Sequence, residues 1–197
     1  MAALAVLVGY GLGSLAFAVL VSRAMRLADP RSYGSQNPGA TNMLRSGSKL
    51  AALLTLLLDA AKGGVAVWLV QALGWVPPSS SALYAVGLAA FLGHLYPVFF
   101  GFRGGKGVAT AMGVVTGLGW PMGLVYAVVW LGMLAVTRIS SLAGMCAAVS
   151  APLAAWALGY DVYAPVLVAI AALVIWLHRT NIARLRNGDE PKVGSSK

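Results

Sequence analysis

The sequence predicts an all-α, polytopic integral membrane protein with about seven transmembrane helices, and its composition is the first reason. Hydrophobic residues occupy 59% of the 197 positions, charged residues occupy 10%, and the mean hydropathy is +0.82. Soluble domains are only about 45–50% apolar and about 25% charged. A helix needs about 20 apolar residues to cross a bilayer. We therefore expect a single transmembrane domain over residues 1–197.

Seven apolar runs, separated by charge, glycine or proline, are the second reason. None shows the sustained period-2 alternation of a membrane β-barrel, so helices are predicted. Two neighbouring runs, 108–118 and 122–136, are shorter than a bilayer requires, and Gly119, Trp120 and Pro121 between them could form a hairpin tip. A single re-entrant hairpin is therefore an open alternative. The runs are 1–21, 50–73, 82–100, 108–118, 122–136, 142–158 and 162–177.

The distribution of basic residues is the third reason, and it also predicts the orientation. The second, fourth and sixth connections contain no Lys or Arg, so the positive-inside rule places the N-terminus outside and the C-terminus in the cytoplasm. Thirteen of the 14 basic residues follow this pattern, and Lys62, within a span, is the exception. The basic residues expected on the cytoplasmic side are Arg23, Arg26, Arg31, Arg45, Lys49, Arg103, Lys106, Arg138, Arg179, Arg184, Arg186, Lys192 and Lys197.

Several classes of function are disfavoured by composition. The net charge of +9 suggests nucleic acid in a soluble chain, but stacking aromatics are not interleaved with the basic residues, so membrane lipid is the expected partner. The single Cys146 disfavours disulfides and cysteine-based metal sites, and paired acids are absent. No basic residue precedes Arg23, so the first run is predicted to be a span rather than a cleaved signal peptide. We expect no metal, cofactor or obligate protein partner.

The first connection is long and rich in hydroxyl, amide and glycine residues between Asp29 and Arg45. Glycine and asparagine permit backbone conformations in which successive N–H groups converge on an anion, and an arginine can bind that anion through two donors. The connection could instead be a solvated linker. Because long loops in small domains are more often functional than idle, we predict a phosphate or carboxylate site here.

A second polar cluster extends from Gly101 to Gly107 and leads directly into the apolar run that begins at Val108. A glycine-rich turn at a helix N-terminus combines free backbone donors with a positive dipole, and Lys106 adds a point charge. The spacing is not that of a Walker A motif. Anchoring of Arg103 and Lys106 to lipid headgroups would explain the charges but not the glycines. We therefore predict a second phosphate site.

Three ionisable residues lie within predicted spans. Asp59 and Lys62 are three residues apart on one helix face, and a structural ion pair is expected because either charge alone is costly in lipid. His94 is either functional or a satisfied polar contact, and the sequence leaves both interpretations open. The connection 137–141 adds Ser141 to the predicted cytoplasmic face.

The tail after the last run begins with His178 and Asn181, which would share a face if the helix continues. The alternative is a basic helix end that binds anionic lipid. All the polar clusters favour anions and lie on the same predicted face of the membrane. The residues alone therefore indicate a membrane enzyme or carrier that handles a phosphorylated, partly apolar molecule.

At these residues the sequence resembles the bacterial acyl-phosphate:glycerol-3-phosphate acyltransferases, the PlsY family. The segments 34–42 (GSQNPGATN) and 94–110 (HLYPVFFGFRGGKGVAT) are similar to the first two family motifs, and 178–182 (HRTNI) with Glu190 is similar to the third. The motifs occur in the same order over nearly the whole chain. Gln36 and Pro38 depart from the pattern, because smaller or more flexible residues are expected there.

The resemblance implies a seven-helix enzyme of the bacterial inner membrane with a cytoplasmic active site. Its implied reaction transfers an acyl group from acyl phosphate to the 1-hydroxyl of sn-glycerol 3-phosphate, giving lysophosphatidic acid and phosphate in the first step of phospholipid synthesis. A transporter of an organic phosphate is the alternative. It is disfavoured because the charges lie at one face rather than at the midplane and no inverted repeat is visible.

The resemblance also implies which residues act in the reaction, and we hypothesise a role for each from its chemistry. His178 would act as the base, with the departing phosphate as the alternative, and Asn181 would orient it or the substrate. Ser35 would help to hold the donor headgroup. The implied catalytic residues are Ser35, His178 and Asn181, and the implied substrate-binding residues are Asn37, Gly39, Thr41, Asn42, Arg45, Gly104, Gly105, Lys106, Gly107 and Ser141.

Overall fold

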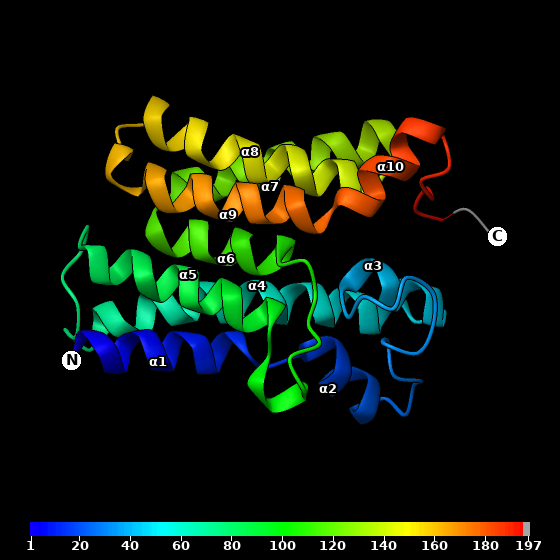
Figure 1. The fold of residues 1–197 in the computed structure, drawn as a ribbon, viewed down its shortest axis with the longest axis horizontal. Helices are drawn as coiled ribbons and strands as arrows, with labels where there is room; N and C mark the ends of the chain where they lie inside the picture. The colour runs from blue at the N-terminus through cyan, green and yellow to red at the C-terminus, as the bar shows by residue number, and fades with distance from the viewer. Residues whose placement is uncertain (195–197) are drawn as a thin grey trace.

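The computed structural model describes residues 1–194, and every regular element in that range is helical (Figure 1). The prediction of an all-α fold is confirmed. Lys197, counted above among the basic residues of the tail, lies outside the described residues. The helices form an elongated bundle whose long members are roughly parallel to its long axis (Figure 1).

Each predicted apolar run corresponds to a helix or to a bent pair of helices. Within residues 1–194, four helices are long and apolar enough to cross a membrane, and two bent pairs raise the number to six. The four are α4 (Lys49–Ala72), α5 (Ser81–Leu95, with the turn Val98–Phe100), α7 (Trp120–Thr137) and α8 (Ser140–Ala157). The pairs are α1 (Ala2–Gly13) with α2 (Phe17–Ala24), and α9 (Ala164–Leu177) with α10 (Arg179–Asn187).

The remaining apolar run, 108–118, forms α6 (Val108–Leu118), which has only 11 residues. Trp120 and Pro121 form the first turn of the full-length helix α7 rather than a hairpin tip, because proline is well suited to a helix N-terminus. Only Gly119, in extended conformation, separates α6 from α7. The expected short run 122–136 is thus part of an 18-residue helix, and α6 alone is too short to span by length.

Small residues allow the helices to approach closely, which is typical of packing in membranes. A Cβ on Gly113 of α6 would lie 1.8 Å from the carbonyl oxygen of Ala60 on α4, and one on Gly63 would lie 2.3 Å from that of Thr110. The two backbones therefore lie too close together for a side chain at either position. As a result, the N-terminus of α6 lies beside the middle of α4 rather than at its end.

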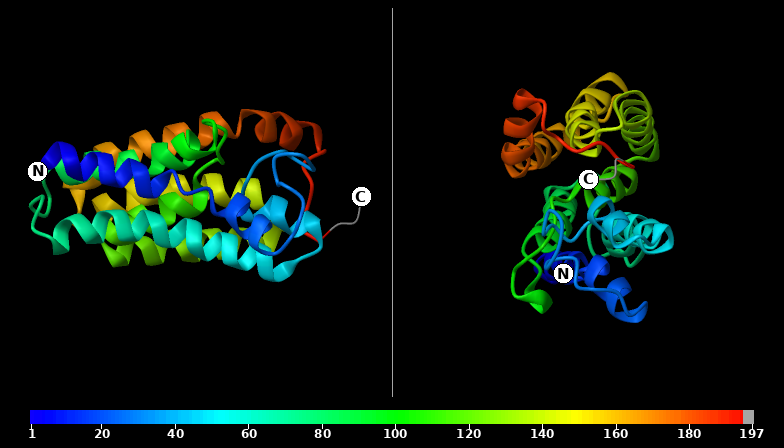
Figure 2. Two further views of the ribbon diagram at one scale, coloured as in Figure 1. Left: turned by 90° about the horizontal axis from the view of Figure 1, so that it is seen from below. Right: turned by 90° about the vertical axis from the view of Figure 1, so that its right-hand side faces the viewer.

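The polar segments meet at the end of the bundle opposite the N-terminus (Figures 1 and 2). This end carries the first connection with the short helix α3 (Ala40–Met43), together with α10 and the tail that follows it. Gly188, with φ of 78°, ends α10 and turns the chain back. Val193 N–H then donates to the carbonyl of Arg138 (2.7 Å), which ties the tail to the turn between α7 and α8.

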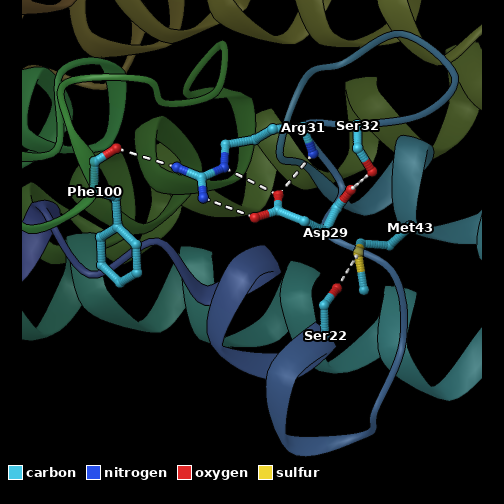
Figure 3. A network of polar contacts seen from close by, with 6 residues as sticks. All are labelled: Ser22, Asp29, Arg31, Ser32, Met43 and Phe100. Atoms are coloured by element: carbon cyan, nitrogen blue, oxygen red, sulfur yellow. Dashed lines mark hydrogen bonds and ion pairs between the residues drawn. The ribbon is translucent and has the colours of Figure 1, made fainter.

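Polar contacts of Asp29, Arg31 and Phe100 join the first connection to the segment after α5 (Figure 3). Arg31 pairs with Asp29 (Nη2 to Oδ2, 2.7 Å) and donates through Nη1 to the carbonyl of Phe100 (3.1 Å). The hydrogen bond from Arg31 holds the pKa of Asp29 below its ordinary value. On the other side, the Ser22 hydroxyl donates to Met43 Sδ (3.3 Å), which attaches α2 to α3. The contact between Arg31 and Phe100 thereby holds the first connection and the segment after α5 together.

Candidate active site

A cavity of about 360 Å³ lies at this polar end, between the first connection, the start of α6 and the bend between α9 and α10. Every predicted site residue except Gly104 and Gly105 borders it. The predicted residues in its wall are Ser35, Asn37, Gly39, Thr41, Asn42, Arg45, Lys106, Gly107, Ser141, His178 and Asn181. Four segments that are far apart in the sequence therefore form one site: the first connection, the start of α6, the start of α8 and the α9–α10 bend.

Asn181 is at the centre of the polar network. Its side chain is buried, its Oδ1 accepts a hydrogen bond from Lys106 Nζ, and its Nδ2 donates to Glu190 Oε1. Glu190 also accepts from the Ser141 hydroxyl (2.7 Å) and pairs with Arg184 Nε (2.7 Å). Glu190 belongs to a predicted motif but has no predicted role, and Arg184 is not among the predicted site residues. The signal for Glu190 was its charge, because it is among only five acids in the chain.

His178 lies at the 57° bend between α9 and α10 and is 4% exposed. Its Nδ1 is 2.7 Å from the carbonyl oxygen of Val174, which can only accept, so Nδ1 carries the hydrogen. The other ring nitrogen of the neutral imidazole is then free to accept a proton. The helix continues past the bend, since Ile182 N–H donates to the His178 carbonyl (2.8 Å). Both His178 and Asn181 border the cavity, as expected from their spacing.

Lys106 reaches the same network from the glycine-rich turn. Gly107, with φ of 80°, forms the N-cap of α6, and a Cβ there would lie 2.2 Å from the ring of Phe91. Only glycine fits this position without a shift. Burial and the neighbouring charge of Arg184 lower the pKa of Lys106 to about 8, although Glu190 opposes the shift. The turn therefore presents a cation whose pKa is about 8.

Gly104 and Gly105, before Lys106, pack against His94 instead of bordering the cavity. A Cβ on Gly104 would lie 2.0 Å from the carbonyl oxygen of His94, and one on Gly105 would lie 2.3 Å from His94 Nε2. Neither glycine borders the cavity, and their role as substrate-binding residues stays a prediction. Close packing, which the sequence pattern cannot distinguish from ligand approach, explains both residues.

Asn42 also has an internal role that the sequence did not indicate. Its side chain is buried, its Oδ1 accepts from Ser35 N–H (3.0 Å), and its Nδ2 donates to the carbonyl of Pro30 (2.7 Å). Arg45 donates to the same Oδ1 (3.2 Å). Asn42 thus shapes the loop and directs Arg45. Gln36 adopts φ of 56°, a left-handed conformation that favours glycine, which agrees with its departure from the motif.

Two exposed hydroxyl residues belong to the mouth of the cavity. Thr41 Oγ1 is 2.7 Å from Ser140 Oγ, at the start of α8. Ser35 borders the cavity from the exposed part of the first connection. The contact between Thr41 and Ser140 connects the first connection with the α7–α8 side of the bundle.

The inner end of the cavity is bordered by Asp59 and His94. The predicted ion pair is confirmed, because Lys62 Nζ is 2.7 Å from Asp59 Oδ1. His94 Nδ1 is 3.5 Å from the same oxygen. Of the two interpretations left open for His94, the contact with Asp59 is observed. Within residues 1–194, no group of three or more His, Cys, Asp and Glu side chains is arranged to hold a metal ion.

An apolar cavity of about 210 Å³ adjoins the polar one, lined by residues of α4, α6 and α7. Leu56, Val108, Ala109 and Trp130 belong to the walls of both cavities. The remaining wall residues are Met112, Tyr126, Ala127 and Leu131. A cavity with charged side chains beside an apolar cavity suits a molecule with a charged head and a hydrocarbon chain.

We expect Glu190→Gln to destabilise the protein in a pH-dependent manner. Burial acts to raise the pKa of Glu190, but hydrogen bonds from Ser141, Asn181 and Arg184 outweigh it and lower the pKa below the ordinary 4.5. The carboxylate therefore stabilises the fold above that value, and the contribution is lost as the pH falls through the folded-state pKa. The substitution should lower the free energy of unfolding by about 1–3 kcal/mol at pH 7.

Thermal unfolding in detergent at pH 7 and at pH 4 measures this difference. Asp189→Asn, an exposed neighbouring acid, is the control and should leave the unfolding temperature unchanged. An equal loss of stability for Glu190→Gln at both pH values would contradict the assignment.

The fold and the cavity define an integral membrane protein with a cationic, hydrogen-bonding pocket at one end of its bundle. A family model described as "Glycerol-3-phosphate acyltransferase" matches residues 3–188. The chain belongs to the glycerol-3-phosphate acyltransferase family. It is an all-helical membrane acyltransferase, as the resemblance of its motifs implied.

Related proteins match over almost their full length. A glycerol-3-phosphate acyltransferase of Erythrobacter litoralis is 51% identical over 197 residues, which cover 98% of this chain and 95% of the relative. One of Laribacter hongkongensis is 55% identical, with 95% and 94% covered. The crystal structure of PlsY, an integral membrane glycerol 3-phosphate acyltransferase, in its glycerol 3-phosphate form has a TM-score of 0.90 at 40% identity, with 98% and 96% covered. The lysophosphatidic acid form gives a TM-score of 0.88.

Proposed function

We propose that the protein transfers an acyl group from acyl phosphate to the 1-hydroxyl of sn-glycerol 3-phosphate, producing lysophosphatidic acid and phosphate. The observation that carries the proposal is that the Lys106–Asn181–His178 cavity and the apolar cavity between α4, α6 and α7 are neighbours that share four wall residues. A phosphate and an acyl chain can then be bound within reach of one histidine. The names of the relatives, and of the PlsY forms with glycerol 3-phosphate and lysophosphatidic acid, support the acceptor.

The cations around the cavity suit two phosphorylated substrates. Lys106 borders it from the glycine-rich turn and Arg184 from α10, and Arg45 and Lys49 border it from the first connection and the start of α4. Arginine binds phosphate through two parallel donors, whereas lysine acts as a point charge. We assign the phosphate of glycerol 3-phosphate to Lys106 with Arg45, and the donor headgroup to the side of Ser35 and Thr41.

Acyl phosphate is a mixed anhydride, so the protein needs to position and neutralise charge rather than create a strong nucleophile. The 1-hydroxyl oxygen attacks the acyl carbon, a new ester C–O bond forms, and the C–O bond to phosphate breaks. His178 takes the hydroxyl proton on the ring nitrogen that is not bonded to Val174. Asn181, held by Lys106 and Glu190, orients the reacting groups. No cofactor takes part in this scheme.

The experiment uses detergent-purified protein with acyl phosphate and radiolabelled glycerol 3-phosphate, without vesicles and with a chelator in a parallel sample. We expect labelled lysophosphatidic acid in both samples. Product from acyl-CoA but not from acyl phosphate would refute the donor. Failure to form product, together with uptake of glycerol 3-phosphate into vesicles containing the protein, would support a transporter instead.

Ala127→Trp is expected to shift donor preference toward shorter acyl chains. Ala127 lies on α7 in the wall of the apolar cavity, where an indole ring would occupy the space proposed for the acyl chain. Each methylene that is kept out of an apolar site loses about 0.8 kcal/mol of transfer free energy. Specificity constants for C8 to C18 acyl phosphates measure the change. Val128→Trp, at an exposed position of α7, is the control. If Ala127→Trp leaves the preference for acyl-chain length unchanged, the acyl chain is not bound in this cavity.

We further propose that the protein lies in the bacterial inner membrane with its N-terminus outside and its cavity open to the cytoplasm. Support comes from the basic residues near the cavity, including Arg45, Lys106 and Arg184, because cytoplasmic ends carry the excess of Lys and Arg. Ser35→Cys in a Cys146→Ala background tests it. A membrane-impermeant thiol reagent should label that position only after the cells are opened, and labelling of intact cells would overturn the orientation.

A further inference from the structure

A buried polar network lies under the glycine-rich turn, outside the residues assigned to substrate contact. Asp59, Lys62 and His94 are 2%, 4% and 7% exposed. Asp59 Oδ1 is 2.7 Å from Lys62 Nζ and 3.5 Å from His94 Nδ1, so one carboxylate connects α4 with the end of α5. Because isolated charges are costly inside a membrane protein, the three side chains hold one another in place.

The network also reaches the break between α1 and α2. Lys62 Nζ donates to the carbonyl oxygen of Leu15 (2.7 Å), in the short segment between these helices. The ammonium group also lies 5.7 Å from the centre of the Phe17 ring. Three separate parts of the bundle are thereby fixed relative to one another: the α1–α2 break, the middle of α4 and the end of α5.

The glycine-rich turn rests directly on His94. Gly105 N–H donates to the carbonyl of His94 (3.2 Å), and a Cβ on Gly105 would lie 2.3 Å from Nε2 of the imidazole. The imidazole edge is thus the surface on which the turn packs. Lys106 is the next residue, and its Nζ donates to Asn181.

We propose that Asp59, Lys62 and His94 form a positioning network. The network fixes the position of the glycine-rich turn relative to α4 and α5 and so directs Lys106 toward the substrate phosphate. His94 acts through the turn, because its Nε2 faces the backbone of Gly105. This inference rests on the proposed function, in which Lys106 binds glycerol 3-phosphate. Displacement of Lys106 should weaken binding of that substrate more than it slows the chemical step.

Steady-state kinetics of His94→Leu provide the first test. The leucine fills much of the space but removes the contact with Asp59 and the imidazole edge. We expect the KM for glycerol 3-phosphate to rise about tenfold or more, with kcat and the KM for acyl phosphate within about threefold. Leu88→Ala, a partly buried position earlier on α5, is the control and should lower thermal stability without changing either KM.

A double-mutant cycle keeps the proposal testable if His94→Leu does not fold. In His94→Asn the amide nitrogen can replace Nδ1 beside Asp59, while the atoms that face Gly105 are removed. Gly105→Ala places a methyl group where Nε2 now lies. The combined variant should therefore raise the KM for glycerol 3-phosphate by less than the product of the two single effects. The shift in unfolding temperature produced by glycerol 3-phosphate gives a second readout that does not require turnover.

The outcomes separate the two proposals. If the wild-type protein forms no lysophosphatidic acid and is not stabilised by glycerol 3-phosphate, the proposed function fails. If the wild type is active but His94→Leu keeps its KM for glycerol 3-phosphate, or if the cycle is strictly multiplicative, the positioning network is overturned.

Discussion

His178→Ala is expected to lower kcat by about 10²- to 10⁴-fold, the usual contribution of a positioned general base. The imidazole is 4% exposed, and its Nδ1–H is bound to the carbonyl of Val174 (2.7 Å), so the remaining nitrogen is kept as a proton acceptor. Removing the ring removes the acceptor but leaves Lys106 and Asn181 to bind substrate. The KM for glycerol 3-phosphate should therefore change much less than kcat.

Purified variants assayed with saturating acyl phosphate measure this effect. Thr180→Ala, two residues further along at an exposed position, is the matched control and should retain full activity. If His178→Ala retains near-normal turnover, His178 is not the base, and the departing phosphate must accept the proton instead.

Lys106→Met should raise the KM for glycerol 3-phosphate by about 10- to 100-fold. The change removes a cation that donates to Asn181 from a half-buried position, and a hydrogen bond to a charged group contributes about 1.5–3 kcal/mol. Arg103→Met is the matched control, since this basic residue is in the same turn but is exposed. Equal effects of the two substitutions would indicate a general electrostatic contribution rather than a specific contact.

The same lysine predicts a pH dependence. Burial, together with the charge of Arg184, lowers the pKa of Lys106 to about 8, so the ammonium form predominates below this pH and is lost above it. The value of kcat/KM for glycerol 3-phosphate should decline as the pH rises through about 8. Lys106→Arg should remove this decline, because a guanidinium stays protonated throughout the range. A decline that persists in Lys106→Arg would assign the titration to another group.

Much of the candidate site follows from residue type and spacing. His178 and Asn181 are three residues apart, and both border the cavity because α10 continues the helical backbone after the bend. Lys106 follows a glycine-rich turn at the start of α6 and faces the same cavity. Asp59 and Lys62, also three residues apart, form the expected ion pair. Local spacing is informative in these cases because the partners lie on one helix or at its end.

Other assignments depended on contacts between distant segments. Gly104 and Gly105 look like phosphate-binding residues in the sequence, yet they pack against His94, 10 and 11 positions earlier. Asn42 is a residue type that often binds ligands, but its amide group forms hydrogen bonds with the backbone of its own loop. A polar side chain cannot be assigned to a partner or to a cavity until the neighbouring elements are in place.

The sequence by itself determined the membrane class, the apolar segments and the gathering of the polar, basic segments at one end of the bundle. These properties follow from local chemistry, because each span must be apolar over its own length and charges favour one side of the bilayer. The tertiary structure alone decided that α6 begins beside the middle of α4, that His94 supports the glycine-rich turn, and that Glu190 joins Ser141 to Asn181. These contacts depend on how closely glycine-containing helices approach and on where α1–α2 and α9–α10 bend, and neither is encoded in any single segment.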